Sequence, residues 1–161
     1  AQEFKKEDTI MPTKNQEASS QGRDLLEEVY KATTMGVTAT DILLPKVEDQ
    51  ALRSQIERQR NNYQGMASKA RELLENEGED AGKGSRPMQK AMLWGSIQMN
   101  TLMNNSTEHM AEMMIQGSTM GIVDMQKRLN DLPASEEKPR RLAEEFIEGE
   151  QHSIENLKQL L

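Results

Sequence analysis

The sequence predicts an all-α protein: an antiparallel bundle of four main helices with an additional helical linker segment and an extended N-terminal arm. Its hydrophobic fraction is 35% and its aromatic fraction only 3%, a composition that suits packed helices better than β-sheets. Apolar residues recur at intervals of three and four along most of the chain. Short stretches with Gly or Pro, at Pro45, 76–87 and Pro133, separate these segments. The 161 residues are an ordinary length for one domain.

The first half of the chain predicts an arm followed by two helices. Residues 1–20 are polar, contain Pro12 and show no helical period, so we expect an extended or disordered arm. Apolar residues at helical spacing predict a helix over 21–46, which Pro45 interrupts near its end. A second helix is expected over 48–77, where it stops in the Gly-rich stretch "NEGEDAGKGSRP".

The second half predicts three further helices. Ser85 and Pro87 are placed as an N-cap and an early helical residue, so a helix is expected over 86–104. The stretch "NNST" predicts a break before a helix over 106–130, and "DLPAS" predicts a turn before the last helix, over 135–161. Residues 21–161 would then form one helical domain, in which residues 79–105 link two helical hairpins.

Seven methionines of the second half of the chain lie in two series spaced by eleven residues, close to three helical turns. We expect both series, together with Gly95, Ser106, Gly117 and Gly121, to form one stripe that packs in the core, since thioethers fill irregular gaps between closely approaching helices. A groove for a partner helix and a thioether copper site are the alternatives. The two series are Met88, Met99 and Met110, and Met92, Met103, Met114 and Met125.

Composition excludes several classes of function. The formal net charge is −7, and basic residues alternate with Glu, so we expect no nucleic-acid partner. The chain has no Cys, which excludes disulfides and thiolate sites. No apolar run is long enough to span a membrane, and the N-terminus lacks the apolar segment of a signal peptide, so we expect a cytoplasmic protein.

The paired-helix layout, with the stretches "DLLEEVYKATTMGVTATDILLPKVED" and "EEFIEGEQHSIENLKQLL", resembles the ferritin-like superfamily. Over about residues 20–161 the chain is similar to rubrerythrin-like bundles and to Firmicute ferritin-like proteins of the spore coat F type. Members that hold two iron or manganese ions place a Glu on each of two helices and a Glu-x-x-His on each of the others. The resemblance therefore implies either such a metal centre or a form that has lost its ligands.

The inward-facing positions predict that the metal ligands have been lost. On the last helix these positions hold Glu150 and Ser153, and on the second helix Gln59 and Asn62. The inward-facing positions of the first helix hold Thr33, Gly36 and Thr40. Those of the helix over 106–130, the third main helix of the bundle, hold Met114, Gly117, Ser118 and Gly121. One carboxylate cannot hold a dinuclear centre, so no cofactor is predicted. Glu150 is either a residual ligand or acid, or one member of a polar core cluster that fixes helix register. The predicted cluster comprises Glu150, Ser153, Gln59, Asn62 and Tyr63.

Two histidines have carboxylates nearby in sequence. Glu112 follows His109 by three residues, and Glu148 precedes His152 by four. Both pairs fall mainly on the outer face of their helices, so we interpret them as solvated side chains rather than metal ligands.

Three functions are compatible with the sequence. The first is a non-enzymatic bundle that acts through self-association or a structural, coat-type role, cytoplasmic or associated with spores, in which the arm docks through Ile10 and Met11. The second is a ferritin-type di-metal oxidase or a metal storage protein. The third is a small-molecule carrier with a cavity lined by methionine. The first is preferred, because no motif for catalysis is present.

Overall fold

The computed structural model describes residues 14–76 and 87–161, and all regular secondary structure in these ranges is helical. In chain order the elements are α1 (Lys14–Leu43), the 3₁₀ turn η1 (Leu44–Lys46), α2 (Gln50–Asn76), α3 (Pro87–Met103), α4 (Thr107–Asp131) and α5 (Glu137–Lys158). The all-α prediction is therefore confirmed for the described residues. No helix in these ranges combines the length and apolarity that crossing a lipid bilayer requires.

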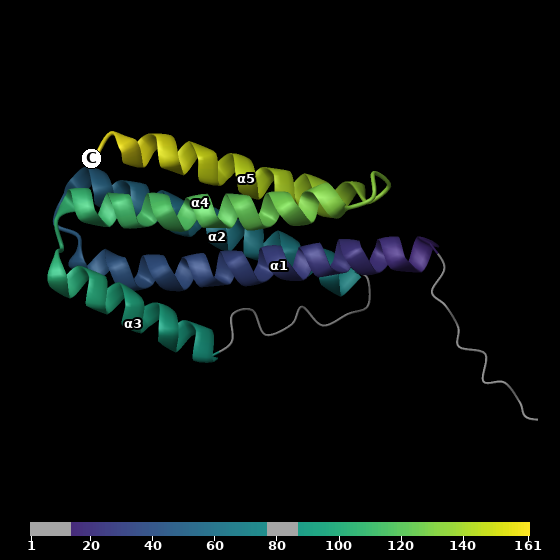
Figure 1. Cartoon of the computed structure of the whole chain (residues 1–161), viewed down its shortest axis with the longest axis horizontal. Helices are drawn as coiled ribbons and strands as arrows, with labels where there is room; N and C mark the ends of the chain where they lie inside the picture. The colour runs from purple at the N-terminus through teal and green to yellow at the C-terminus, as the bar shows by residue number, and fades with distance from the viewer. Residues whose placement is uncertain (1–13, 77–86) are drawn as a thin grey trace, which may run out of the picture.

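The helices are arranged as two antiparallel pairs with α3 to one side (Figure 1). α1 packs along α2, and α4 packs along α5. α5 also contacts both α1 and α2, which joins the two pairs. α3 packs mainly against α1 and diverges from the other helices (Figure 1). Much of its surface is consequently not covered by the described part of the chain.

The predicted boundary between arm and first helix was wrong. α1 begins at Lys14, so residues 14–20 belong to a helix rather than to the arm. The segment "KNQEASS" contains no Gly or Pro, and Glu17 and Ala18 are good helix formers, so a polar turn can extend the helix without an apolar face. Residues 1–13, with Ile10 and Met11, lie outside the described residues.

Local signals fix the starts of two helices. The Asp49 side chain accepts a hydrogen bond from the Leu52 amide at 2.8 Å, which caps the first turn of α2. The Ser106 hydroxyl accepts one from the His109 amide at 3.2 Å and caps α4 in the same way. Pro45 sits in η1, where the chain leaves α1.

Two apolar clusters fill the interior, one toward each end of the helices. The first joins the N-terminal half of α1 and the C-terminal half of α2 with the facing parts of α4 and α5. The second lies at the other end of the four helices and also receives residues from η1 and α3. Representative buried members are Leu26, Met66, Met125 and Phe146 in the first cluster, and Leu43, Ile56, Ile97, Met110 and Leu157 in the second.

The methionines do not form one buried stripe. Met110 and Met125 are buried as expected, but Met92 is 70% exposed and Met99 is 73% exposed, so the core interpretation was wrong for these two residues. The non-helical residues 104–106 separate α3 from α4. Because each helix then has its own axis, an eleven-residue spacing across the break no longer places two side chains on the same face.

The small residues of the same stripe also behave differently from the prediction. A Cβ atom added at Gly95 or Gly117 would meet no neighbour within 4 Å, so neither glycine marks a close approach of helices. A Cβ at Gly121 would lie 3.5 Å from the Phe146 ring, which is an ordinary packing distance. The predicted alternation of large and small core residues is therefore absent from α3 and reduced in α4.

Candidate functional site

A layer of buried polar side chains lies where the first apolar cluster gives way to the second. Each of α1, α2, α4 and α5 contributes at least one of its members, and none is more than 8% exposed. We refer to this set as the polar layer. Its members are Thr33, Gln55, Gln59, Tyr63, Ser118, Glu150 and Ser153.

A chain of hydrogen bonds runs through the polar layer from the surface to a buried carboxyl group. Arg58 donates from Nη2 to Gln55 Oε1 at 2.8 Å, and Gln55 donates from Nε2 to Gln59 Oε1 at 3.4 Å. Gln59 is hydrogen-bonded to the Tyr63 hydroxyl, and Tyr63 to the Glu150 carboxyl. Each of these side chains can donate a hydrogen bond to the next one, so the series of bonds ends at an acceptor, the Glu150 carboxyl.

Burial determines the protonation of Glu150. Removal from water raises the pKa of its carboxyl group, because the charged form loses its hydration. Hydrogen bonds with Ser118 and Tyr63 oppose this rise, since they stabilise the carboxylate, yet the net pKa shift is upward. The environment thus favours the neutral acid more than water does.

The same surroundings keep the Tyr63 phenol protonated. Burial raises its pKa well above 10, and the charge of Glu150 and the hydrogen bond to it raise the pKa further. Hydrogen bonds from Gln59 and Ser118 act in the opposite direction but do not outweigh these effects. Tyr63 therefore serves as a hydrogen-bond donor to Glu150 at neutral pH.

Inaccessibility limits what the polar layer can do chemically. Its members are buried on all sides by the four helices, so a substrate could reach Glu150 only if the helices separated. A hydrogen-bonded buried network does, however, favour the one alignment of helices that satisfies it. The arrangement fits the predicted role of a polar core cluster better than that of a catalytic acid.

Four of the five residues predicted for this cluster are buried together. Glu150, Ser153, Gln59 and Tyr63 all belong to the polar layer, and direct bonds link Glu150, Tyr63 and Gln59. Asn62 is exposed instead. Its Nδ2 would lie 2.9 Å from a Cβ added at Gly149, so the amide covers the surface of α5.

Sequence reasoning missed Gln55 as a member of the polar layer. The available signal was its spacing, because Gln55 precedes Gln59 by four residues and Gln59 precedes Tyr63 by four. Residues four apart share a helix face, so the three side chains form one line along α2.

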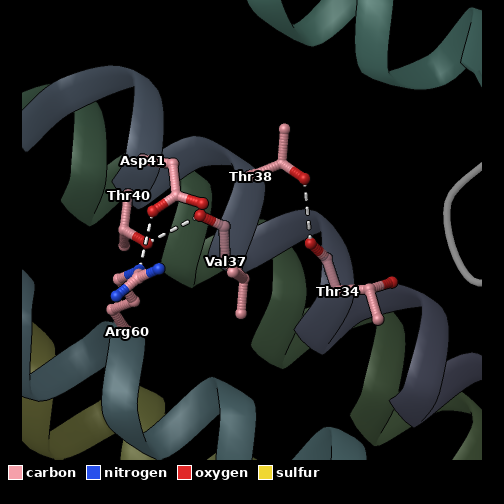
Figure 2. A network of polar contacts seen from close by, with 6 residues as sticks. All are labelled: Thr34, Val37, Thr38, Thr40, Asp41 and Arg60. Atoms are coloured by element: carbon pink, nitrogen blue, oxygen red, sulfur yellow. Dashed lines mark hydrogen bonds and ion pairs between the residues drawn. The ribbon is translucent and has the colours of Figure 1, made fainter.

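The threonines of α1 are bonded to their own helix. Thr33 donates to the Val29 carbonyl at 2.7 Å. Figure 2 shows the next turns, where Thr38 donates to the Thr34 carbonyl at 3.1 Å and Thr40 to the Val37 carbonyl at 2.8 Å. The backbone of α1 therefore satisfies hydroxyl groups that the sequence placed toward the interior.

An ion pair joins α1 to α2 beside these threonines. Arg60 Nε lies 2.6 Å from Asp41 Oδ1 (Figure 2). The Arg60 side chain is 37% exposed and the Asp41 side chain 50% exposed, so water screens the pair and it contributes little to stability. The pair links α1 to α2 at a partly exposed position.

The donor set does not fit a di-metal centre. Among residues 14–76 and 87–161, no three His, Asp or Glu side chains come together as metal ligands. Glu150 is the buried carboxylate of the polar layer, and its neighbours are hydroxyl and amide groups. Glu112, Glu148 and His152 are exposed, in agreement with their prediction as solvated side chains. The prediction was wrong for His109, which is only partly exposed and whose Nε2 is buried without a hydrogen-bond partner among the described residues.

An open depression of about 610 Å³ lies between α4 and α5, away from the polar layer. Its lining is mostly polar and contains no Met, so it does not correspond to the methionine-lined cavity that a small-molecule carrier would need. Arg140, at its edge, donates to the Leu132 carbonyl at 2.8 Å and ties α5 to the end of α4. The lining residues are Gln126, Leu129, Asn130, Arg140, Glu144, Ile147, Glu148 and Gln151.

Comparison of the chain with family models, with curated proteins and with solved structures finds no match.

Proposed function

We propose that this chain is a non-enzymatic helical bundle that acts through self-association, in a structural role. The two antiparallel pairs, α1 with α2 and α4 with α5, support a ferritin-like four-helix layout to which α3 is added. Metal-binding members of that superfamily hold their ligands on side chains that face the bundle core. The polar layer consists of buried side chains of α1, α2, α4 and α5. Its hydroxyl and amide groups support a bundle without a metal centre.

The uncharged outer face of α3 is the observation that carries this proposal. Residues 91–107 contain no Asp, Glu, Lys, Arg or His, although 29% of the chain is charged. Within this segment Met92 and Met99, seven residues apart, are each at least 70% exposed. Two large apolar side chains on one helix face, in a segment without charged residues, are typical of a surface that another protein covers.

The pattern on this face suits a second copy of the same chain. Ser96 is exposed, and a Cβ added at Gly95 would meet nothing within 4 Å, so a shallow gap lies between the two methionines. Two copies of α3 that cross antiparallel about a two-fold axis at this gap would place Met92 of each copy beside Met99 of the other. A large-small-large face is thus complementary to itself, which a symmetric dimer requires.

The test measures the mass of the full chain in solution. We expect light scattering to give about twice the chain mass of 18.3 kDa, and sedimentation velocity to show a concentration-dependent dimer. The double variant Met92→Gln/Met99→Gln keeps the side-chain length but replaces both thioethers with polar amides. It should sediment as a monomer. Its thermal unfolding midpoint should equal that of the parent chain in its monomeric state.

Leu161→Gln is the matched control, since Leu161 is 63% exposed but lies at the C-terminus, after α5. This variant should dimerise like the parent. A parent chain that is monomeric at every concentration would refute the proposal, and a double variant that still dimerises would exclude α3 as the contact. Two equivalents of iron or manganese retained after loading and desalting would favour the alternative, a ferritin-type di-metal protein.

A further inference from the structure

Methionine supplies all the side-chain sulfur of this protein. The chain has 12 Met and no Cys, so a two-electron oxidant that reacts with sulfur has thioethers as its targets. Reaction requires the oxidant to reach the sulfur lone pairs. The exposure of each side chain therefore decides which methionines react first.

The described methionines fall into clearly different exposure classes. Met92, Met99 and Met120 are 68 to 73% exposed, whereas Met66, Met110 and Met125 are at most 2% exposed. Met92 and Met99 share the uncharged face of α3, and Met120 lies on the outer face of α4. Among the methionines whose exposure the structure describes, the three most exposed thus comprise two on the proposed contact face and one on α4.

We propose that Met92 and Met99 form a site of reversible oxidation by hydroperoxides, and that oxidation there dissociates the assembled protein. This inference rests on the proposed self-association through α3. It adds a means of control to that surface, because the same two side chains provide both the contact and the reactive sulfur.

The reaction transfers one oxygen atom. A lone pair of the thioether Sδ attacks one oxygen of the hydroperoxide, and the S–O bond forms as the O–O bond breaks. The proton of the transferred oxygen passes to the leaving oxygen, which departs as water or an alcohol. Sulfur loses two electrons and the peroxide gains two, so the products are methionine sulfoxide and water or alcohol.

Oxidation changes the character of the α3 face without changing the core. Each sulfoxide carries a strongly polar S–O group where the thioether was apolar, so a dimer contact between Met92 and Met99 would bury an unsatisfied acceptor. Both side chains point away from the apolar clusters, so the helices behind them keep their packing. The bundle should therefore stay folded while the dimer separates.

The experiment treats the full chain with hydrogen peroxide and follows two signals over time. Peptide mass spectrometry of the chain diluted until it is monomeric should find oxygen added at Met92, Met99 and Met120 at rates about tenfold or more above those of Met66, Met110 and Met125. Sedimentation should show the dimer converting to monomer in step with oxidation of Met92 and Met99. A methionine sulfoxide reductase should then restore both the mass and the dimer.

Two variants separate the contact face from the other reactive position. Met92→Leu/Met99→Leu keeps an apolar face without sulfur, so it should dimerise and remain dimeric in peroxide. Met120→Leu should dimerise and lose the dimer in peroxide as the parent does. If the Met120→Leu variant stayed dimeric in peroxide, oxidation of Met120 on α4 would control the dimer. The assignment of this control to Met92 and Met99 would then be wrong.

The results also distinguish this inference from the proposed function. If the untreated chain is monomeric, the proposed self-association is wrong and the inference falls with it. If the chain dimerises but stays dimeric with Met92 and Met99 fully oxidised, the self-association stands and the oxidation control is wrong.

Discussion

The carboxyl group of Glu150 is held in the interior by two donors and by the helices around it. Ser118 and Tyr63 hydrogen-bond to it, and Gln59 supports Tyr63 from the next turn of α2. These bonds make burial of an acid tolerable, while desolvation still raises its pKa. The folded state consequently binds the Glu150 proton more tightly than the unfolded chain does.

This difference predicts how stability depends on pH. The contribution of Glu150 to the free energy of unfolding should be fully present below its ordinary pKa of 4.5 and should be lost as the pH rises through the raised pKa of the folded state. Glu150→Gln keeps the shape and removes the titration. We therefore expect the stability of the parent, relative to Glu150→Gln, to fall between acid and neutral pH, as measured by urea unfolding at a series of pH values.

Working below pH 8 keeps the Tyr63 phenol out of the titration, since its pKa lies well above 10. Taking the difference between the two proteins removes the contribution of every other titrating group. Parallel pH profiles would show that Glu150 has the same pKa in both states and would contradict the prediction.

Helical spacing predicted most of this cluster but not its boundary. Intervals of three and four place Gln59, Tyr63 and Glu150 on the inner faces of their helices, and all three are buried there. Asn62 also follows Gln59 at an allowed interval, yet the inner line of α2 advances by four at this point, to Tyr63. Which of two neighbouring positions enters the interior depends on where α5 lies, which a single sequence does not specify.

At the scale of the elements, α1 and α2 are in tight contact at one glycine. A Cβ added at Gly36 would lie 2.7 Å from Cδ2 and Cε2 of the Tyr63 ring. The absence of a side chain at this position therefore lets the ring lie flat against α1. The close approach also positions the Tyr63 hydroxyl for its bond to Glu150.

Two glycine substitutions test this contact. Alanine is the better helix former by about 1 kcal/mol, so Gly65→Ala, where a Cβ meets nothing within 4 Å, should stabilise the protein by up to that amount. Gly36→Ala gains the same propensity but forces the buried ring to move, so a net loss of about 1 to 3 kcal/mol is expected. Urea unfolding of both variants measures the two changes.

The sign of the change in the free energy of unfolding shows whether a Cβ can be accommodated at each glycine. Stabilisation by Gly36→Ala equal to that by Gly65→Ala would mean that the Tyr63 ring is not confined by α1. A loss from both variants would indicate that the exposed surface of α2 at Gly65 has a contact of its own.

The sequence predicted the helices better than the relation between them. Apolar periodicity and caps gave segments close to the observed α2, α4 and α5, because those signals are local. The methionine spacing, in contrast, carries information only along a continuous helix axis. The direction of α3, which precedes the break at residues 104–106, depends on packing against α1, so the exposure of Met92 and Met99 could not be deduced from spacing.

At the scale of the whole molecule, net charge and the α3 face act in opposite directions. The formal charge of −7 makes two copies repel each other. The uncharged segment 91–107 offers a surface where they can meet without bringing like charges into contact. Salt screens the repulsion between distant charges but hardly affects apolar contact.

We therefore expect the dimer to strengthen as ionic strength increases. Sedimentation equilibrium at low and high sodium chloride should give a dissociation constant that falls several-fold with added salt. An interface held by ion pairs would give the opposite trend. A dissociation constant that rises with salt would thus point away from α3 and toward the charged faces of the bundle.

The order in which the helices are synthesised has a consequence for the polar layer. α1 and α2 emerge first and can pair as soon as both are made, since domains form from the N-terminus onward during synthesis. Gln59 and Tyr63 belong to this early hairpin, but Ser118 and Glu150 belong to α4 and α5. The hydroxyl group of Tyr63 can therefore bond to Glu150 only after α5 has been synthesised, so completion of the network follows completion of α5.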